Sequence, residues 1–272
     1  MIKEATVSRG HQAEIYSNKE IISIMNDSLS IQMETLPDYV VFTDKDLYLA
    51  RQLELLGIPV FNSSAAITTS DDKIQTYQLL AKVGVPIPKT IFAPKTFGLP
   101  HAFDDAYFTF IIETFGFPLI IKEAFGSFGE QVYLIENEQA LRDRTTDMAN
   151  RPFMFQECIT SSYGKDLRLQ VVGDKVVAAM ERTSINDFRA NVTAGGTMTP
   201  HNPTEEEARL AIRASQLIGA DFSGVDLLFG DSGALVCEVN SNAHIRNIYD
   251  CTGINAAPYI IDYIENILGD TQ

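Results

Sequence analysis

The sequence predicts an α/β protein built from a small N-terminal α/β unit and two α+β lobes. Between residues 39 and 61, short apolar runs alternate with helical spacing, which indicates parallel strands joined by a crossover helix. In the last third, two pairs of apolar runs are each separated by a short turn signal, which indicates antiparallel hairpins. The length of 272 residues accommodates two or three such units around a shared cleft.

The N-terminal unit is expected to contain two strands with a helix between them. Residues 39–42 and 58–61 are apolar runs typical of buried strands, and residues 44–56 show helical spacing that stops at Gly57. Residues 9–16 look like a helix end that leads into a further strand, although no strand precedes them. The N-terminal unit is therefore expected to be short and to begin after the position of a first strand.

The central part alternates helices and strands. Ser70 is expected to cap a helix that stops at Gly84, because Asp71 and Asp72 then lie in the first turn, where the helix dipole favours negative charge. A second helix is expected at about residues 101–115. Apolar runs predict strands at residues 117–123, 132–135 and 153–157.

The last third has the most regular pattern. The dipeptide Gly173-Asp174 predicts a hairpin between strands at 167–172 and 175–180. Thr204 and Glu207 form a capping box before a helix that ends near Gly219. Strands at residues 225–229 and 234–240 form a second hairpin, and a helix from about residue 254 closes the sequence.

Composition and charge narrow the function classes. The formal net charge of −15 argues against a nucleic-acid partner, because phosphate backbones demand clustered Lys and Arg. Three cysteines without a Cys-x-x-Cys spacing indicate neither a disulfide framework nor a zinc site. No apolar segment is long enough to cross a bilayer and no signal peptide is seen, so a cytoplasmic protein without a membrane partner is expected.

Three oxygen-bearing side chains in the second hairpin predict a metal site. A three-residue loop at 231–233, with Gly233 in the left-handed conformation, places Asp226 directly opposite Glu238, and Asn240 points to the same face. Two facing carboxylates between apolar neighbours repel each other, and a divalent cation such as Mg²⁺ offsets that repulsion. The alternatives are one protonated carboxyl group or an exposed face of the sheet.

A lysine followed by a glycine-containing loop predicts a phosphate site. Lys122 ends an apolar strand and precedes Gly126, Ser127 and Gly129, where backbone N–H groups and an ammonium group can hold an anion. The loop is neither a Walker A sequence nor a Gly-x-Gly-x-x-Gly fingerprint, and an ordinary β-turn explains it equally well. Lys73 is, by itself, equally a solvated helix residue.

Charged side chains also gather at strand ends in the last third. Asp166 and Arg168 lie on one strand face, and residues 187–191 form a second polar cluster, although surface ion pairs are the commoner explanation. The four histidines lack metal-ligand spacing, and Ser127 and Ser232 lack the partners of a nucleophilic triad.

Taken together, these segments resemble the RimK-like α-L-glutamate ligases of the ATP-grasp superfamily. The resemblance covers about residues 60–268, and its stretches are 72–73, 118–122, 126–129, 156–159, 164–168, 171–182, 187–191, 224–226 and 238–240. It implies the ATP-grasp fold with a short N-terminal pre-ATP-grasp domain. The expected domains are residues 1–68, a central lobe at 69–155 and a C-terminal lobe at 156–272.

The resemblance implies a site for ATP. Its expected members are Lys73, Lys122, Gly126, Ser127, Gly129, Glu157, Cys158, Ile159, Asp166, Arg168, Arg189 and Asn191. The two lysines are expected to hold the phosphates while the glycine loop closes over them. Glu157 and the backbone of Cys158 are expected to meet the adenine, and Asp166 the ribose.

The resemblance also implies the catalytic and metal-binding groups. Arg189 and Asn191 are expected to bind phosphate or the incoming carboxylate, and Lys122 and Arg189 to act as catalytic residues that stabilise charge on the transferring group. The expected ligands of Mg²⁺, or of Mn²⁺ in its place, are Asp226, Glu238 and Asn240.

The activity that the resemblance implies is that of an ATP-dependent carboxylate–amine ligase. An acyl phosphate would lead to an amide or peptide bond between glutamate, or a similar amino acid, and a carboxylate of a small molecule or protein C-terminus. The alternatives are a ligase of the lysine-biosynthesis type, which acts on a carrier protein or small metabolite, and an inactive nucleotide-binding module. The family often continues Glu-x-Asn with a Ser-Pro-Gly-like turn, whereas residues 241–244 read Ser-Asn-Ala-His here. The resemblance also allows a homo-oligomer.

Overall fold

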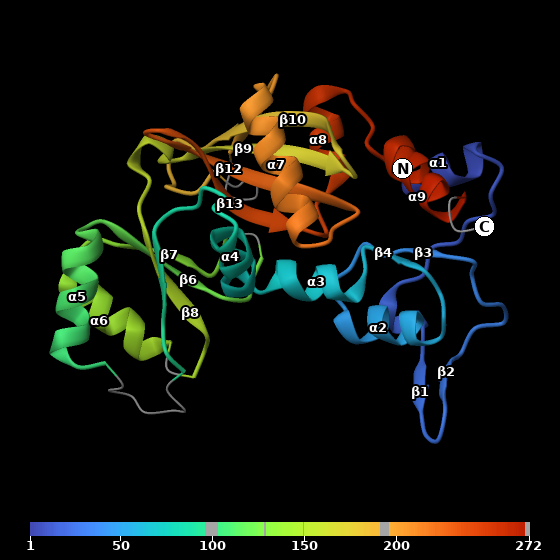
Figure 1. Cartoon of the computed structure of the whole chain (residues 1–272), viewed down its shortest axis with the longest axis horizontal. Helices are drawn as coiled ribbons and strands as arrows, with labels where there is room; N and C mark the ends of the chain where they lie inside the picture. Colours follow the sequence, from blue (N-terminus) through green and yellow to red (C-terminus); the bar gives the residue numbers. More distant parts are fainter. Residues whose placement is uncertain (96–102, 128, 149, 191–195, 270–272) are drawn as a thin grey trace.

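The computed structural model describes residues 1–95, 103–127, 129–148, 150–190 and 196–269 and shows an N-terminal part and two sheet-based lobes (Figure 1). The helices are α1 (Ile2–Ser8), α2 (Leu47–Leu55), α3 (Ser64–Asp71), α4 (Lys73–Lys82), α5 (Asp105–Phe115), α6 (Glu138–Asp147), α7 (Glu205–Leu217), α8 (Ile245–Thr252) and α9 (Ala257–Gly269). The strands are β1 (Ser23–Met25), β2 (Leu29–Ile31), β3 (Val40–Val41), β4 (Val60–Phe61), β5 (Thr90–Phe92), β6 (Leu119–Glu123), β7 (Val132–Ile135), β8 (Phe153–Glu157), β9 (Lys165–Val172), β10 (Lys175–Thr183), β11 (Thr197–Pro200), β12 (Phe222–Gly230) and β13 (Gly233–Asn240). The predicted α/β class is confirmed.

The N-terminal part is built around the parallel pair β3–β4, with α2 as the crossover helix between the two strands. This arrangement was predicted. The strand expected within residues 9–16 was wrong: α1 ends at Ser8, and residues 11–17 form no strand or helix. Ile15 is 76% exposed there, so the segment has no buried face that would hold it against a sheet.

Two features of the N-terminal part were not predicted. A hairpin of β1 and β2 extends away from the rest of the molecule (Figure 1). Helix α1 packs on α9 near the other end of the chain through Ala5, Ala257 and Ile261, and Figure 1 shows both chain ends on that side of the molecule.

The central lobe is a four-stranded antiparallel sheet in the order β5-β8-β6-β7. Helices α5 and α6 cover one face, and their apolar side chains share a core with Leu119, Ile121 and Phe155 of the sheet. Because side chains alternate along a strand, Ile120 and Lys122 face away from these helices. The helix expected at 101–115 begins at Asp105, and residues 101 and 102 lie outside the described ranges.

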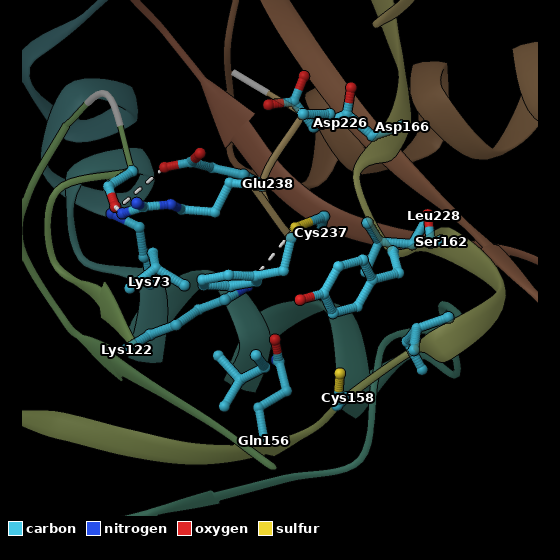
Figure 2. Close-up of a pocket in the computed structure, with 18 of the residues that line it drawn as sticks. Lys73, Lys122, Gln156, Cys158, Ser162, Asp166, Asp226, Leu228, Cys237 and Glu238 are labelled. Carbon is cyan, nitrogen blue, oxygen red and sulfur yellow. Dashed lines mark hydrogen bonds and ion pairs between the residues drawn. The ribbon is translucent and has the colours of Figure 1, made fainter. Parts of the chain in front are cut away.

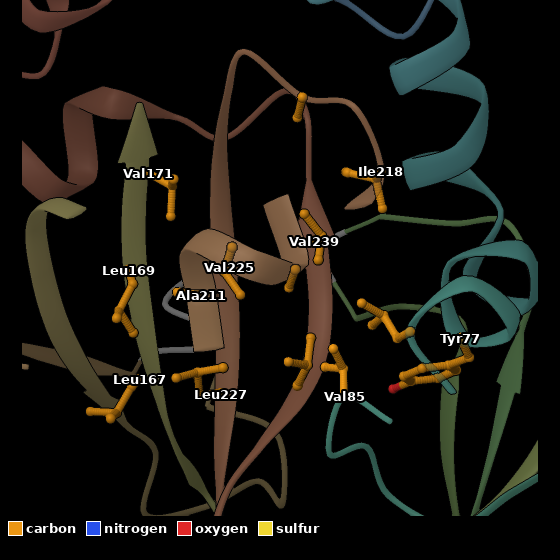
Figure 3. Packing of buried hydrophobic residues seen from close by; sticks show 14 of the residues in the cluster. Tyr77, Val85, Leu167, Leu169, Val171, Ala211, Ile218, Val225, Leu227 and Val239 are labelled. Atoms are coloured by element: carbon orange, nitrogen blue, oxygen red, sulfur yellow. The ribbon is translucent and has the colours of Figure 1, made fainter. Parts of the chain in front are cut away.

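The C-terminal lobe is a five-stranded antiparallel sheet in the order β11-β10-β9-β12-β13. Helix α7 packs on one face, against Leu167, Leu169 and Val171 of β9 and apolar residues of β12 and β13 (Figure 3). The alternate side chains of β9, Asp166 and Arg168 among them, therefore face the opposite side, toward the central lobe's sheet. None of the helices in the described ranges is both long and apolar enough to span a bilayer.

One helix cap is the one that the sequence predicted, and another is not. Helix α7 begins at Thr204 with the predicted capping box to Glu207. Ser70, however, does not cap α4: it lies in the last turn of α3, and Asp72 caps α4 by accepting hydrogen bonds from two backbone N–H groups. A side chain at Asp72 reaches the first free N–H groups, whereas Ser70 is two residues too early. The last helix begins at Ala257 rather than near 254, because α8 already occupies residues before it.

The β12–β13 hairpin has the predicted pairing at Asp226 and Glu238, but its loop and the register near the loop differ from the prediction. Gly230 pairs with Gly233, so the loop has two residues rather than the expected three. A β-bulge then leaves Cys237 without a partner on β12, and this shift restores Asp226 to its place opposite Glu238. The predicted register at the two carboxylates is therefore confirmed, while the predicted loop is wrong.

Candidate active site

A pocket lies between the two sheets and gathers most of the predicted nucleotide-site residues (Figure 2). The predicted residues that line it are Lys73, Lys122, Gly126, Ser127, Gly129, Glu157, Cys158, Ile159, Asp166, Arg189, Asp226 and Glu238. Arg168 and Asn240 lie on the adjoining strands but do not line it, and Asn191 falls outside the described residues. Residues from both lobes and from α4 thus converge on one cavity.

Two lysines reach the pocket from different elements. Lys73 is the first residue of α4, and its Nζ lies 3.2 Å from Glu238 Oε1 and 3.0 Å from the carbonyl oxygen of Gly126. Lys122 lies on β6, is buried, and contacts Cys237 Sγ at 3.5 Å through its Nζ. Burial raises the pKa of the Cys237 thiol, so the sulfur is neutral at pH 7. Lys122 forms no salt bridge within the described ranges, which leaves its charge available to an anion.

Three cations hold the glycine loop in place. Besides Lys73, Lys45 Nζ donates to Ser127 Oγ at 3.0 Å, and Arg189 donates to the carbonyl oxygen of Gly129 at 2.6 Å. Gly126 has a φ of +143°, and a Cβ atom added there would collide with the side-chain amide of Gln131. The loop therefore needs glycine at this position, and its carbonyl groups lie within reach of the same cations that were predicted to bind phosphate.

Arg189 is oriented by a neighbouring carboxylate. Asp187 accepts hydrogen bonds from Arg189 Nε at 3.0 Å and from its NH2 group at 2.8 Å. These hydrogen bonds hold the pKa of Asp187 below its ordinary value, although partial burial opposes the effect. The guanidinium group is thereby fixed beside the pocket with its remaining donor on the loop.

Four charged side chains form a buried network beside the pocket. Arg182 on β10 donates to both carboxylate oxygens of Asp166, at 2.7 and 2.6 Å, and lies 3.0 Å from Asp226 Oδ2. Arg168 donates to both oxygens of Asp226, in one case at 2.8 Å. Burial opposes the ionisation of Asp226, but the two guanidinium groups hold its pKa below the ordinary value. The network contains equal numbers of acidic and basic groups, so it carries no net charge.

Hydrogen bonds within the protein already engage two of the residues with predicted roles. Both oxygens of Asp166, the expected ribose contact, are engaged by Arg182, although Asp166 still lines the pocket. Glu157, the expected adenine contact, accepts a hydrogen bond from the backbone N–H of Lys89 at 2.6 Å. Both roles remain predictions.

The oxygen donors of the predicted metal site are suited to Mg²⁺. Arg168 and Arg182 occupy three of the roughly four lone-pair positions of the Asp226 carboxylate, which leaves one for a cation. Glu238 lies opposite Asp226 on β13, and Asn240 donates its amide N–H to the carbonyl oxygen of Gly224, which leaves its side-chain oxygen as the atom that would bind a cation. Within the described ranges, no three His, Cys, Asp or Glu side chains cluster as metal ligands. Any cation site here thus depends on the amide and on phosphate or water oxygens.

Sequence reasoning missed Arg182 as a member of the site. A two-residue turn with regular pairing would place Glu181 opposite Asp166. A bulge between Val176 and Ala178 shifts the register, so that Arg182 takes that position instead. Lys45 and Cys237 were also missed, and neither carries a motif that could have identified it.

Comparisons with known proteins agree with this geometry. A family model described as RimK-like ATP-grasp domain matches residues 70–264. A protein of Klebsiella pneumoniae (strain 342), named probable alpha-L-glutamate ligase, is 36% identical over 97% of this chain and 90% of its own length. The fold is similar to that of the RimK domain protein ATP-grasp from Sphaerobacter thermophilus, with a TM-score of 0.73 and 20% identity over 96% of this chain and 93% of that one. It is also similar to the ATP-grasp ligase PsnB, solved with a phosphomimetic variant of minimal precursor, Mg and ADP, with a TM-score of 0.70 and 20% identity over 100% of this chain and 94% of that one.

Proposed function

The chain belongs to the family of RimK-like ATP-grasp ligases, and on this premise we propose that it adds L-glutamate to a carboxylate substrate. As an ADP-forming ligase it couples ATP hydrolysis to the formation of an amide bond. The choice of glutamate is supported by the name of the Klebsiella relative. The carboxylate is that of a small molecule or of a protein C-terminus.

The convergence of cations on one pocket carries this proposal. Lys73 of α4, Lys122 of β6 and Arg189 of the segment after β10 all reach the cavity between the lobes. Such a cluster binds the phosphates of ATP and stabilises the charge of the transferring phosphoryl group. Mg²⁺, held by Asp226, Glu238 and Asn240, would supply further charge neutralisation at the phosphate oxygens.

The reaction then needs no nucleophile from the protein. The substrate carboxylate attacks the γ-phosphorus, ADP leaves, and an acyl phosphate forms. The amine of glutamate attacks the acyl carbon, phosphate leaves with the bonding electron pair, and the amine loses a proton. Arg189, whose guanidinium group is held by Asp187, would stabilise the oxyanion of the tetrahedral intermediate. The protein contributes orientation and exclusion of water.

The test is ADP release with Mg-ATP, L-glutamate and pools of candidate carboxylates. We expect one pool to stimulate turnover and Glu238→Gln to lower it at least about 100-fold, because a neutral amide can neither offset Lys73 nor bind a cation equally well. Glu136→Gln, an exposed substitution outside the pocket, is the matched control and should retain full activity.

Two other outcomes would favour a different function. Turnover with another amino acid, or only with a carrier protein, would support a ligase of the lysine-biosynthesis type. Binding of Mg-ATP without ADP release in any pool would count against the ligase and favour an inactive nucleotide-binding module.

A further inference from the structure

The segment that follows Asn240 is held by two side chains from outside its own lobe. Residues 241–244 connect β13 to α8, and Ser241 is only 2% exposed. Its carbonyl oxygen accepts a hydrogen bond from Asn62 Nδ2 at 2.8 Å. Its hydroxyl group hydrogen-bonds to that of Ser70, on α3, at 2.7 Å. Backbone and side chain of Ser241 are thus fixed independently.

Asn62 also fixes the strand next to this segment. Its Nδ2 donates to the carbonyl oxygen of Phe222 at 2.8 Å, and its Oδ1 accepts from the N–H groups of Asp221 and Phe222 at 2.6 and 3.2 Å. Asn62 is fully buried, and these bonds use both donors and both acceptor positions of its amide. One side chain between β4 and α3 therefore joins the start of β12 to the end of β13 (Figure 1).

The same segment lies against the charged face of the sheet. A Cβ atom added to Gly224 would lie 2.6 Å from Ala243 Cβ and 3.0 Å from Arg168 Cδ, so Ala243 packs over Gly224 beside Arg168. Arg168 in turn binds Asp226. None of residues 241–244 lines the pocket assigned to the nucleotide. The segment thus lies beside Arg168 on the charged face, outside the pocket assigned to the nucleotide.

We infer that Asn62 and Ser70 are positioning residues that set the place of residues 241–244 for the amino-acid substrate. The identity of that substrate rests on the proposed function, whereas the positioning itself does not. Because Asn62 precedes the region that the family model matches, the N-terminal part contributes to the placement of this segment.

The first test measures backbone order directly, by hydrogen–deuterium exchange in the full-length protein without ligands. Ser70→Ala removes one hydroxyl from the Ser70–Ser241 pair and should speed exchange in residues 241–244 about fivefold, the equivalent of one neutral hydrogen bond. The matched control is Ser215→Ala, which breaks another buried serine pair, Ser215–Ser223, at 2.8 Å on the α7 side of the sheet. This control should leave exchange in residues 241–244 unchanged.

The second test separates the two substrates kinetically. With Mg-ATP and L-glutamate, Ser70→Ala should raise the KM for glutamate about fivefold and leave the KM for ATP unchanged. An equal rise in both KM values would overturn the assignment to the amino-acid side. Unchanged exchange in Ser70→Ala, or faster exchange throughout the sheet, would overturn the positioning role. Absence of turnover in the wild-type protein would instead contradict the proposed function, and the exchange measurement would still decide the positioning.

Discussion

At the scale of single residues, the charge of Asp226 is balanced by the protein itself. The sequence argument assigned the repulsion between Asp226 and Glu238 to a divalent cation. In the structure, Arg168 and Arg182 bind Asp226, and Lys73 lies 3.2 Å from Glu238. Asp226 is therefore kept ionised before any metal ion binds, which is the protonation state that a metal ligand requires.

Removing Arg182 tests this balance. Arg182→Met leaves Asp166 and Asp226 buried without their shared partner and should lower the free energy of unfolding by about 3–5 kcal/mol. Urea denaturation at pH 7 measures the loss, with the exposed Arg209→Met as the control. The double variant Arg182→Met/Asp166→Asn removes the charge of Asp166, which the single variant leaves unpaired, and should regain part of the stability. A double variant no more stable than the single one would show that Arg182 does not act through this pair.

Asp221 makes stability depend on pH. Burial raises its pKa to about 6, although a hydrogen bond from Tyr263 opposes the shift. The folded protein therefore holds this proton more tightly than the unfolded chain, in which an Asp ionises at about pH 4. The contribution of Asp221 to stability is thus present below about pH 4 and is lost as the pH rises to about 6.

Asp221→Asn should remove this dependence. Asparagine can still accept the hydrogen bond from Tyr263 and carries no charge to bury. Relative to the wild type, we expect the variant to be more stable by about 1–3 kcal/mol at pH 7 and equally stable near pH 4. Urea denaturation at both pH values measures the difference, and a constant difference at both would contradict the assignment.

At the scale of elements, the N-terminus of α4 positions Lys73, which we propose binds phosphate. Asp72 accepts hydrogen bonds from the N–H groups of Ile74 and Gln75, and Lys73 is the first residue of the helix. The backbone N–H of Lys73 also donates to Ala124 at the end of β6, at 2.9 Å. The cap therefore determines where the helix begins, and with it the position of the Lys73 backbone from which the side chain extends.

Loss of this cap should affect stability and substrate binding together. Asp72→Ala is expected to lower the free energy of unfolding by about 1 kcal/mol and to raise the KM for ATP severalfold. Asp72→Asn retains a capping oxygen and should lose much less of both. Thermal unfolding and ADP release measure the two effects, and equal losses in both variants would show that charge rather than capping is responsible.

At the scale of the whole molecule, Asn62 joins parts of the chain that are far apart in sequence. Its partners Asp221, Phe222 and Ser241 lie between 159 and 179 positions away. Asn62→Ala would leave four buried backbone groups without partners and should lower the free energy of unfolding by about 3 kcal/mol or more. The exposed Asn26→Ala, which loses hydrogen bonds to Ser28, is the control. Urea denaturation measures the free energy of unfolding of both variants. A loss in Asn62→Ala no greater than that in Asn26→Ala would contradict this role.

The sequence by itself determined most of the local elements and selected many of the residues that line the pocket. Short apolar runs identified β6, β7 and β8, and pairs of such runs around a turn signal identified both C-terminal hairpins, because strands that lie in a core are rich in apolar side chains. The ordered motifs then selected residues from Lys73 to Glu238 that the fold brings to one cavity. The pairing of Asp226 with Glu238 was also accessible from the sequence.

Only the tertiary structure decided the bulges and the long-range contacts. A bulge is a local backbone adjustment fixed by packing, and the period of the side chains does not reveal it. The bulges in β10 and β13 place Arg182 opposite Asp166 and Cys237 in the pocket. The contacts of Lys45 with Ser127 and of Asn62 with Ser241 join residues separated by 82 and 179 positions, and nothing local to either partner specifies the other. Such contacts form only once the lobes have packed, which is why the sequence leaves them undetermined.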